Sequence, residues 1–351
     1  MILRHEELAL AREYARSTTV EPLTREQTKL VMARGRELFH WFKDHMAIHY
    51  AINLGVLTLL LGSDYLILLQ LPRLLLSEGA VQSLSPVLVA SLVCGGLHSY
   101  LLYSLSVFSM HEGAAHGIVF PGAHPVSRAL NWCAANLCRI GAAEPRYFAE
   151  HHMSHHSKFG TENDGEFLNF VQPRRFWLTL LPFAAFVNFT DFVAHRPPHY
   201  TRGRVVSAVV GLSYHGAYGL VMADRFGALF ALLSFVLFLP HVGFFLDRLR
   251  QFSEHNLMPL DNKEGARSFG VGFWGLLIGG GPWGQPCHWE HHLVASLPWY
   301  LQIRLHFYLK GLLTEAQKRH FLLQPVIGYP KLLLRLWTEP GRFVGRRHTP
   351  V

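Results

Sequence analysis

Residues 46–71 read MAIHYAINLGVLTLLLGSDYLILLQL, with Asp64 as their one charged residue. An α-helix needs about 20 predominantly apolar residues to cross the hydrocarbon core of a bilayer, so this stretch is long enough to span it. A second uncharged run covers residues 86–110. Only 16% of the 351 residues are charged, against about 25% in soluble domains. The sequence therefore predicts an all-α integral membrane protein.

Three further apolar runs cover residues 176–193, 205–222 and 226–246. Lys and Arg accumulate in the short cytosolic loops of membrane proteins. Of the 32 Lys and Arg residues, Arg73 is the only one between the first two runs, and Arg225 the only one in the turn Ala223–Phe226. We therefore expect these two loops to face outward. The spans are about 46–71, 86–110, 205–222 and 226–246, in two hairpins, and 176–193 is an interfacial helix.

The remaining segments are polar and predicted to be cytosolic. Residues 1–45 show no cleavable signal pattern, and Thr24–Phe42 is typical of an amphipathic helix at the membrane surface. We expect one membrane domain over 46–310 with a helical cytosolic cap, followed by a cytosolic tail over 311–351. The net charge of +8 is typical of juxtamembrane residues that face anionic lipid and does not indicate nucleic-acid binding.

The sequence contains 23 histidines, nearly as many as its 24 Asp and Glu residues together. The four cysteines are too few and too scattered for a disulfide framework, an iron–sulfur cluster or a cysteine-ligated zinc site. A metal site would therefore need imidazole ligands.

The histidines gather in three clusters at the predicted cytosolic ends of helices. They are His111-Glu-Gly-Ala-Ala-His116, His151-His152-Met-Ser-His155-His156 and His288-Trp-Glu-His291-His292. His255 lies alone after the fourth span. We interpret His49, His98, His215 and His241, within the spans, as ordinary polar residues with local partners.

Residues three and four apart share one face of a helix, so His152 points with His155 and His156, and His288 with His291 and His292. Adjacent residues diverge by about 100°, so one helix could supply imidazoles to two neighbouring metal ions. His111 and His116 are five apart and converge only if the helix ends or bulges there. Imidazole suits iron, copper, zinc and nickel, so ligand type leaves the metal open.

The three clusters, their order and the expected topology resemble the integral-membrane fatty acid desaturase and hydroxylase superfamily over residues 45–310. The resemblance implies a non-haem di-iron centre with dioxygen as co-substrate. It implies as ligands His111, His116, His152, His155, His156, His255, His288, His291 and His292. Gln251 stands where some acyl-CoA desaturases have an Asn near the metal, and His151 is an alternative to His152.

The resemblance implies oxidation of an unactivated C–H bond of a fatty acyl lipid or free fatty acid, with desaturation favoured. Oxidative decarboxylation to a terminal alkene and hydroxylation or ketolation of a lipid or carotenoid remain open. Two alternatives outside the superfamily are a bis-histidine haem cytochrome and a structural zinc protein. Electrons would come from a separate ferredoxin, rubredoxin or cytochrome b5-like protein, and the setting would be a bacterial inner membrane with the active site on its cytosolic side.

Two sets of charged residues are expected near this site. Possible acceptors for ring N–H groups are Glu112, Glu150, Asp164, Glu254 and Glu290. A basic face could dock an acidic electron donor or anionic lipid, and it consists of Arg248, Arg250, Lys263, Arg267, Arg304, Lys310, Lys318 and Arg319.

Overall fold

The computed structural model describes residues 20–76, 83–137, 144–161, 164, 201–255, 258–259 and 263–323, together with part of 327–334. The described residues form helices and one isolated bridge between Ser268 and Leu322. The chain divides into two compact units, each built from separate stretches of sequence. Unit 1 contains residues 1–46, 149–178 and 248–351, and unit 2 contains residues 47–148 and 179–247. The interfacial helix predicted over 176–193 lies outside the described residues.

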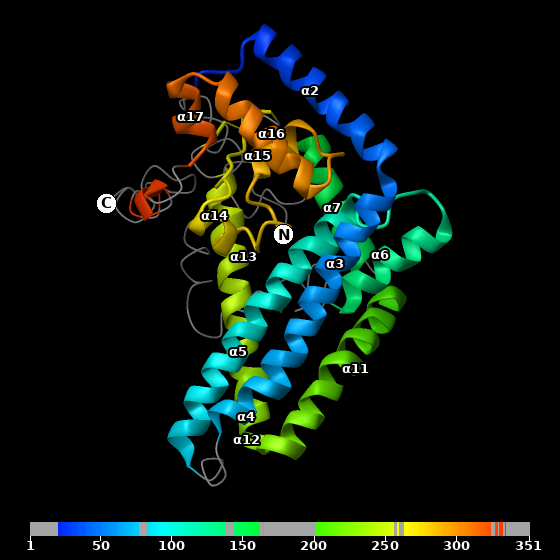
Figure 1. Cartoon of the computed structure of the whole chain (residues 1–351), viewed down its shortest axis with the longest axis vertical. Helices are drawn as coiled ribbons and strands as arrows, with labels where there is room; N and C mark the ends of the chain where they lie inside the picture. The colour runs from blue at the N-terminus through cyan, green and yellow to red at the C-terminus, as the bar shows by residue number, and fades with distance from the viewer. Residues whose placement is uncertain are drawn as a thin grey trace, which may run out of the picture. The chain divides into compact units, whose positions relative to one another are not determined.

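Unit 2 contains the long apolar helices. Helix α3 (Met46–Tyr65) continues through η1 (Leu66–Gln70) into α4 (Leu71–Leu75), and α5 (Leu84–Ser106) continues into η3 (Val107–Ala115). Helix α11 (Thr201–Phe226) is the third, and Figure 1 shows α3, α5 and α11 side by side. Three stretches of the described chain are long and apolar enough to cross a membrane, namely Met46–Leu75, Leu84–Ala115 and Val205–Phe226.

The outward faces of these helices are apolar. Leu74, Leu212 and Leu220 expose 83%, 71% and 74% of their surface. Exposing such an apolar face to water is unfavourable, so soluble proteins rarely have one, whereas lipid tails would cover it. Inward-facing side chains such as Leu68, Cys94 and Phe230 form the core of the unit. The chain is thus a membrane protein.

The fourth predicted span, 226–246, lies in a contiguous helical stretch made of α12 (Ala228–Leu232), η5 (Leu233–Phe238) and α13 (Leu239–His255). Its status as a span stays a prediction. The turn before it falls at Gly227, one residue past the predicted Ala223–Phe226 turn, because α11 continues through Phe226. Gly227 has φ = +91°, a conformation that residues with a Cβ rarely adopt.

Unit 1 contains α2 (Arg25–Asp44), most of α7 (Pro145–Lys158), and the end of α13. Its C-terminal part contains α14 (Phe273–Ile278), α15 (His288–Leu293), α16 (Trp299–Leu312) and α17 (Glu315–Phe321). Thr24 caps α2 as expected, by accepting a hydrogen bond from the backbone N–H of Gln27.

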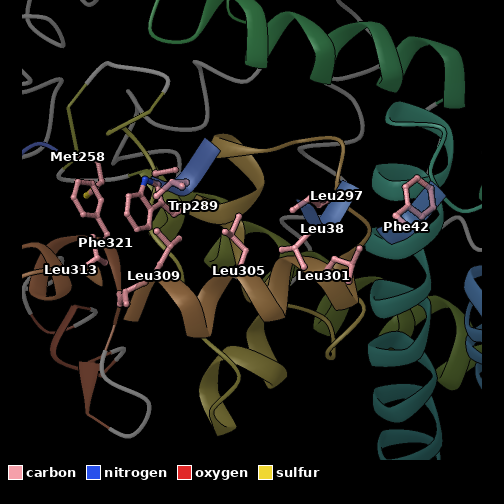
Figure 2. Close-up of a cluster of buried hydrophobic side chains, with 13 residues drawn as sticks. Leu38, Phe42, Met258, Trp289, Leu297, Leu301, Leu305, Leu309, Leu313 and Phe321 are labelled. Atoms are coloured by element: carbon pink, nitrogen blue, oxygen red, sulfur yellow. The ribbon is translucent and has the colours of Figure 1, made fainter. Parts of the chain in front are cut away.

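The core of unit 1 fixes α15 against its neighbours. Leu301, Leu305 and Leu309, on one face of α16, form a buried cluster with Leu38 and Phe42 of α2 and Trp289 of α15 (Figure 2). Trp289 stacks on Phe321 with ring centroids 4.2 Å apart. The apolar face of α2 is therefore covered by protein, and the location of α2 at the membrane surface stays a prediction.

Candidate metal centre

The second histidine cluster lies on α7, whose first turn is capped by the Glu144 carboxylate accepting from the Tyr147 N–H. His152 and His156, four residues apart, bring their Nε2 atoms to 3.0 Å. His155 turns to a different face and is fully buried. The helical spacing predicted this divergence of His155 from His156.

The third cluster forms the short helix α15, and His288, His291 and His292 are all buried. The Nε2 atoms of His288 and His292 are 3.1 Å apart. Between them on the helix, the Glu290 carboxylate accepts hydrogen bonds from His306 Nδ1 of α16 at 2.7 Å and from the Ser268 hydroxyl. Glu290 therefore accepts from a ring N–H, that of His306 outside the implied ligand set, and this bond anchors α15 to α16.

His255 ends α13 and meets α15. Its Nε2 lies 2.8 Å from the Nε2 of His288, and its ring lies 5.0 Å from that of His155. This contact joins residues that are 33 positions apart in the chain.

Two clusters of imidazoles result within unit 1. The four-histidine cluster consists of His155, His255, His288 and His292, each offering a nitrogen within 4.8 Å of the others. The three-histidine cluster consists of His152, His156 and His291, and His291 Nε2 lies 2.8 Å from His156 Nε2. Each adjacent pair is thus divided between the two clusters. His155 and His292 belong to the four-histidine cluster, and their neighbours His156 and His291 belong to the three-histidine cluster.

The four-histidine cluster fits a cation because of its tautomers. His255 Nδ1 faces the carbonyl oxygen of Gly265 at 2.9 Å, and His155 Nδ1 faces Asp164 Oδ1 at 2.9 Å. These oxygens only accept, so both Nδ1 atoms carry hydrogens and, in neutral rings, each Nε2 presents a lone pair. His288 is held the same way, by Gln285 Oε1 at 3.0 Å. Two lone pairs facing each other at 2.8 Å, as in His255 and His288, need a cation between them.

The distances agree with metal ligation. With imidazole–metal bonds of about 2.1 Å, two nitrogens at a right angle lie roughly 3.0 Å apart. Four Nε2 pairs in the two clusters are 2.8 to 3.1 Å apart, and the ligand atoms within each cluster all lie within 4.8 Å of one another. A proton could bridge only one such pair, and it would leave a buried imidazolium beside other rings.

Burial also favours the neutral ligand form. The pKa of His288 and the pKa of His292 lie well below the usual value, first because burial disfavours the charged ring and then because neighbouring histidines repel it. Metal ions bind neutral imidazole. These two rings therefore remain available as ligands at neutral pH.

The first histidine cluster belongs to unit 2 and lies in a π-helical turn, η3. The N–H of His116 donates to the carbonyl of His111 at 3.1 Å, the i to i+5 bond of a π-helix. This wider turn brings the rings of His111 and His116 to 4.8 Å between centroids, which is the second of the two ways, a helix end or a bulge, in which the sequence allowed them to converge. Glu112 Oε1 lies 3.1 Å from His111 Nδ1, so Glu112 orients His111.

The other carboxylates expected near the histidine rings lie in three different environments. Asp164 holds His155, and its second oxygen accepts from the Gly160 N–H at 2.9 Å. Glu254 is buried against Arg250, with one oxygen 3.7 Å from His288 Nε2. Glu150 is exposed on α7. Gln251 is partly buried on α13, and its role beside the metal stays a prediction.

Sequence reasoning missed two groups that orient rings, the Gly265 carbonyl and the Gln285 amide. A backbone carbonyl has no sequence signal. Gln285 precedes His288 by three residues, but α15 begins only at His288, so helical spacing could not relate the two.

Two residues of the predicted basic face are buried. Arg250 and Arg267 are 9% and 5% exposed, so they are interior residues and cannot contact a docking protein. Arg250 bonds Glu254. Lys263, Arg304, Lys310 and Arg319 are exposed, as expected, and the Arg248 side chain lies outside the described residues.

Two of the histidines within the apolar helices have close polar contacts. His49 Nε2 lies 2.7 Å from the carbonyl of Ile118, and His98 Nδ1 lies 3.0 Å from Asp64. These contacts agree with their interpretation as ordinary polar residues. The side chain of His241 lies outside the described residues.

Comparison with known proteins supplies the family. The family model described as fatty acid desaturase matches residues 83–323, which is more than half of the chain and includes all three histidine clusters and His255. The match begins at α5 rather than at residue 45. No curated protein and no solved structure matches the chain significantly. With residues 83–323 matched, this chain belongs to the fatty acid desaturase family.

Proposed function

We propose that this protein is a membrane-bound, di-iron, dioxygen-dependent enzyme that desaturates a fatty acyl chain. Family membership makes it an oxidoreductase of fatty acyl substrates. The observation that supports the metal is the four-histidine cluster, whose lone pairs converge while Asp164, Gly265 and Gln285 hold three of the opposite ring nitrogens.

Nine histidines would hold two irons. The four-histidine cluster would bind one iron, and the three-histidine cluster would bind the other together with His111 and His116. The part of His111 and His116 rests on ligand count and family membership. Bound iron would supply the power to activate dioxygen and oxidise an unactivated C–H bond, which no protein side chain has.

The chain's own residues would orient and enclose this chemistry. Asp164, Gly265 and Gln285 keep Nδ1 protonated in His155, His255 and His288, so that Nε2 faces inward. The buried ring of Trp289 and the apolar face of α16 exclude water from the back of α15.

Electrons would arrive from a separate protein, a ferredoxin, rubredoxin or cytochrome b5-like donor. The exposed Lys263, Arg304, Lys310 and Arg319 are the basic residues that would attract an acidic partner. The active site would face the cytosol of a bacterial inner membrane, with four spans in two hairpins.

Expression in a host with a defined lipid composition would test the reaction. Desaturation predicts fatty acids with one added internal double bond and no change in carbon number. An added oxygen would instead identify a hydroxylase or ketolase, and a terminal alkene one carbon shorter would identify a decarboxylase. His292→Ala expressed at the same level is the control and should give none of these products. An intense Soret absorption band in the purified protein would contradict the non-haem proposal.

A further inference from the structure

We propose that Gln285, fixed by Arg250, is a positioning residue that sets the tautomer of His288 and so aims its Nε2 at the metal. The inference deepens the proposed function, since it rests on iron bound by the four-histidine cluster. It assigns a purpose to two buried residues and to the glycine-rich stretch that precedes them.

Gln285 contacts both partners through a single oxygen. Its Oε1 lies 2.8 Å from a guanidinium nitrogen of Arg250 and 3.0 Å from His288 Nδ1. Gln285 is 1% exposed, so water does not compete for these contacts.

Arg250 decides which way the amide points. Amide oxygen and nitrogen are normally assigned from their hydrogen-bonding partners. A guanidinium only donates, so the atom that faces it must be the oxygen; a flipped amide would put two donors against each other. The same oxygen therefore faces His288, and His288 Nδ1 must donate to it. Nε2 then presents its lone pair to the cluster.

Arg250 is itself held rigidly. The Arg250 nitrogen that contacts Gln285 also donates to both carboxylate oxygens of Glu254, at 3.0 and 2.9 Å. Arg250 lies one turn before Glu254 on α13. The buried guanidinium is thereby neutralised by a buried carboxylate. The Arg250–Glu254 pair therefore adds no net charge beside the metal site, and its guanidinium still donates to Gln285.

The glycine-rich turn of residues 279–284 places Gln285 beside Arg250 and His288. The Gln285 N–H donates to the carbonyl of Gly279 at 2.8 Å, which closes the turn. Gly281 has φ = +89°. A Cβ on Gly284 would lie 1.8 Å from the Gly279 oxygen. Only glycine allows so tight a return of the chain directly before α15.

The test compares buried glutamines in the full-length protein, purified in detergent and loaded with ferrous iron. Gln285→Met keeps the length of the side chain and removes the acceptor, whereas Gln285→Glu keeps an acceptor oxygen. Gln317→Met is the matched control: Gln317 is also buried in unit 1, but it bonds Gln27 and the Pro22 carbonyl. Iron retained per chain is measured against increasing chelator.

We expect Gln285→Met to release one of its two irons at a chelator concentration about 10- to 100-fold lower than wild type, the usual effect of losing a group that orients a ligand. Gln285→Glu and Gln317→Met should retain both irons. The inference is overturned if Gln285→Met matches wild type, or if Gln285→Glu loses iron as readily as Gln285→Met. Wild-type protein that binds no iron would overturn the proposed function as well.

A second measurement needs no variant at position 285. In zinc-loaded wild-type protein containing isotope-labelled histidine, NMR should show His288 with Nδ1 protonated and Nε2 metal-bound. A His288 ring with protonated Nε2 would refute the inference even if no Gln285 variant folds.

Discussion

At the scale of single residues, the ring nitrogens that face one another are the observation that supports a metal site. His255 Nε2 lies 2.8 Å from His288 Nε2 although His255 lies outside the three sequence clusters. His255→Ala should lower the iron content of the purified protein and abolish turnover, because it removes one of four converging imidazoles. His49→Gln is the control, since His49 bonds the Ile118 carbonyl instead. Full iron and full activity in His255→Ala would reduce the ligand set to eight.

Asp164 is the carboxylate that holds a ligand-candidate ring most directly, at 2.9 Å from His155 Nδ1. Asp164→Ala should weaken iron binding about 10- to 100-fold, the usual cost of losing a partner of a metal ligand. Chelator competition on purified protein measures this change. Asp44→Ala, at an exposed position of α2, should leave iron binding unchanged, and an equal loss in both variants would show that the effect is not specific to Asp164.

At the scale of helices, the apolar unit contains a buried polar link. Asp64 of α3 and His98 of α5 are 0% and 1% exposed and lie 3.0 Å apart. Tyr214 of α11 donates to the other oxygen of Asp64 at 3.4 Å. Asp64 therefore links three helices within the bilayer, where an uncompensated charge is costly.

This link predicts non-additive effects on stability. Asp64→Leu or His98→Leu alone should destabilise the folded protein by about 3–5 kcal/mol, because each leaves a buried polar partner without its counterpart. The double variant should cost less than the sum of the two single variants. Unfolding measured in detergent gives all three values. Strictly additive effects would show that the two side chains do not interact.

The stacked pair Trp289 and Phe321 predicts how α15 depends on the C-terminal helices. Phe321→Ala should destabilise the protein by about 3–5 kcal/mol, because it opens a cavity against a buried indole ring. Phe307→Ala is the matched control, since Phe307 is 56% exposed on α16. Its effect should stay within about 0.5 kcal/mol. Thermal unfolding of both variants provides the comparison, and equal losses would contradict the importance of the stack.

At the scale of the whole molecule, the distribution of Lys and Arg predicts the topology. Both termini and residues 112–204 should be cytosolic, since only Arg73 and Arg225 fall in the proposed outer loops. Single cysteines introduced at positions 20, 198 and 320 of a cysteine-free variant should react with a membrane-impermeant reagent only from the cytosolic side. Labelling of position 198 from outside would make 176–193 a true span and place the histidine clusters on opposite sides.

The sequence by itself determined the features that depend on local geometry. Apolar runs longer than a bilayer core predicted the long helices, and spacings of three and four residues predicted which rings of α7 and α15 share a face. Even the five-residue spacing of His111 and His116 indicated that the helix must end or bulge there for the two rings to converge, and η3 is such a bulge. Such relations hold because the geometry of a helix is the same wherever it packs.

Only the tertiary structure decided what depends on contacts between distant segments. It brought His255 to His288, chose Gln285 and the Gly265 carbonyl as orienting groups, and buried Arg250 and Arg267 inside the protein. It also covered the apolar face of α2 with α16. Helical periodicity shows which face of a helix is apolar but not what covers it, because the partner of a side chain is set by how separate helices pack and by where tight turns such as Gly279–Gly284 direct the chain.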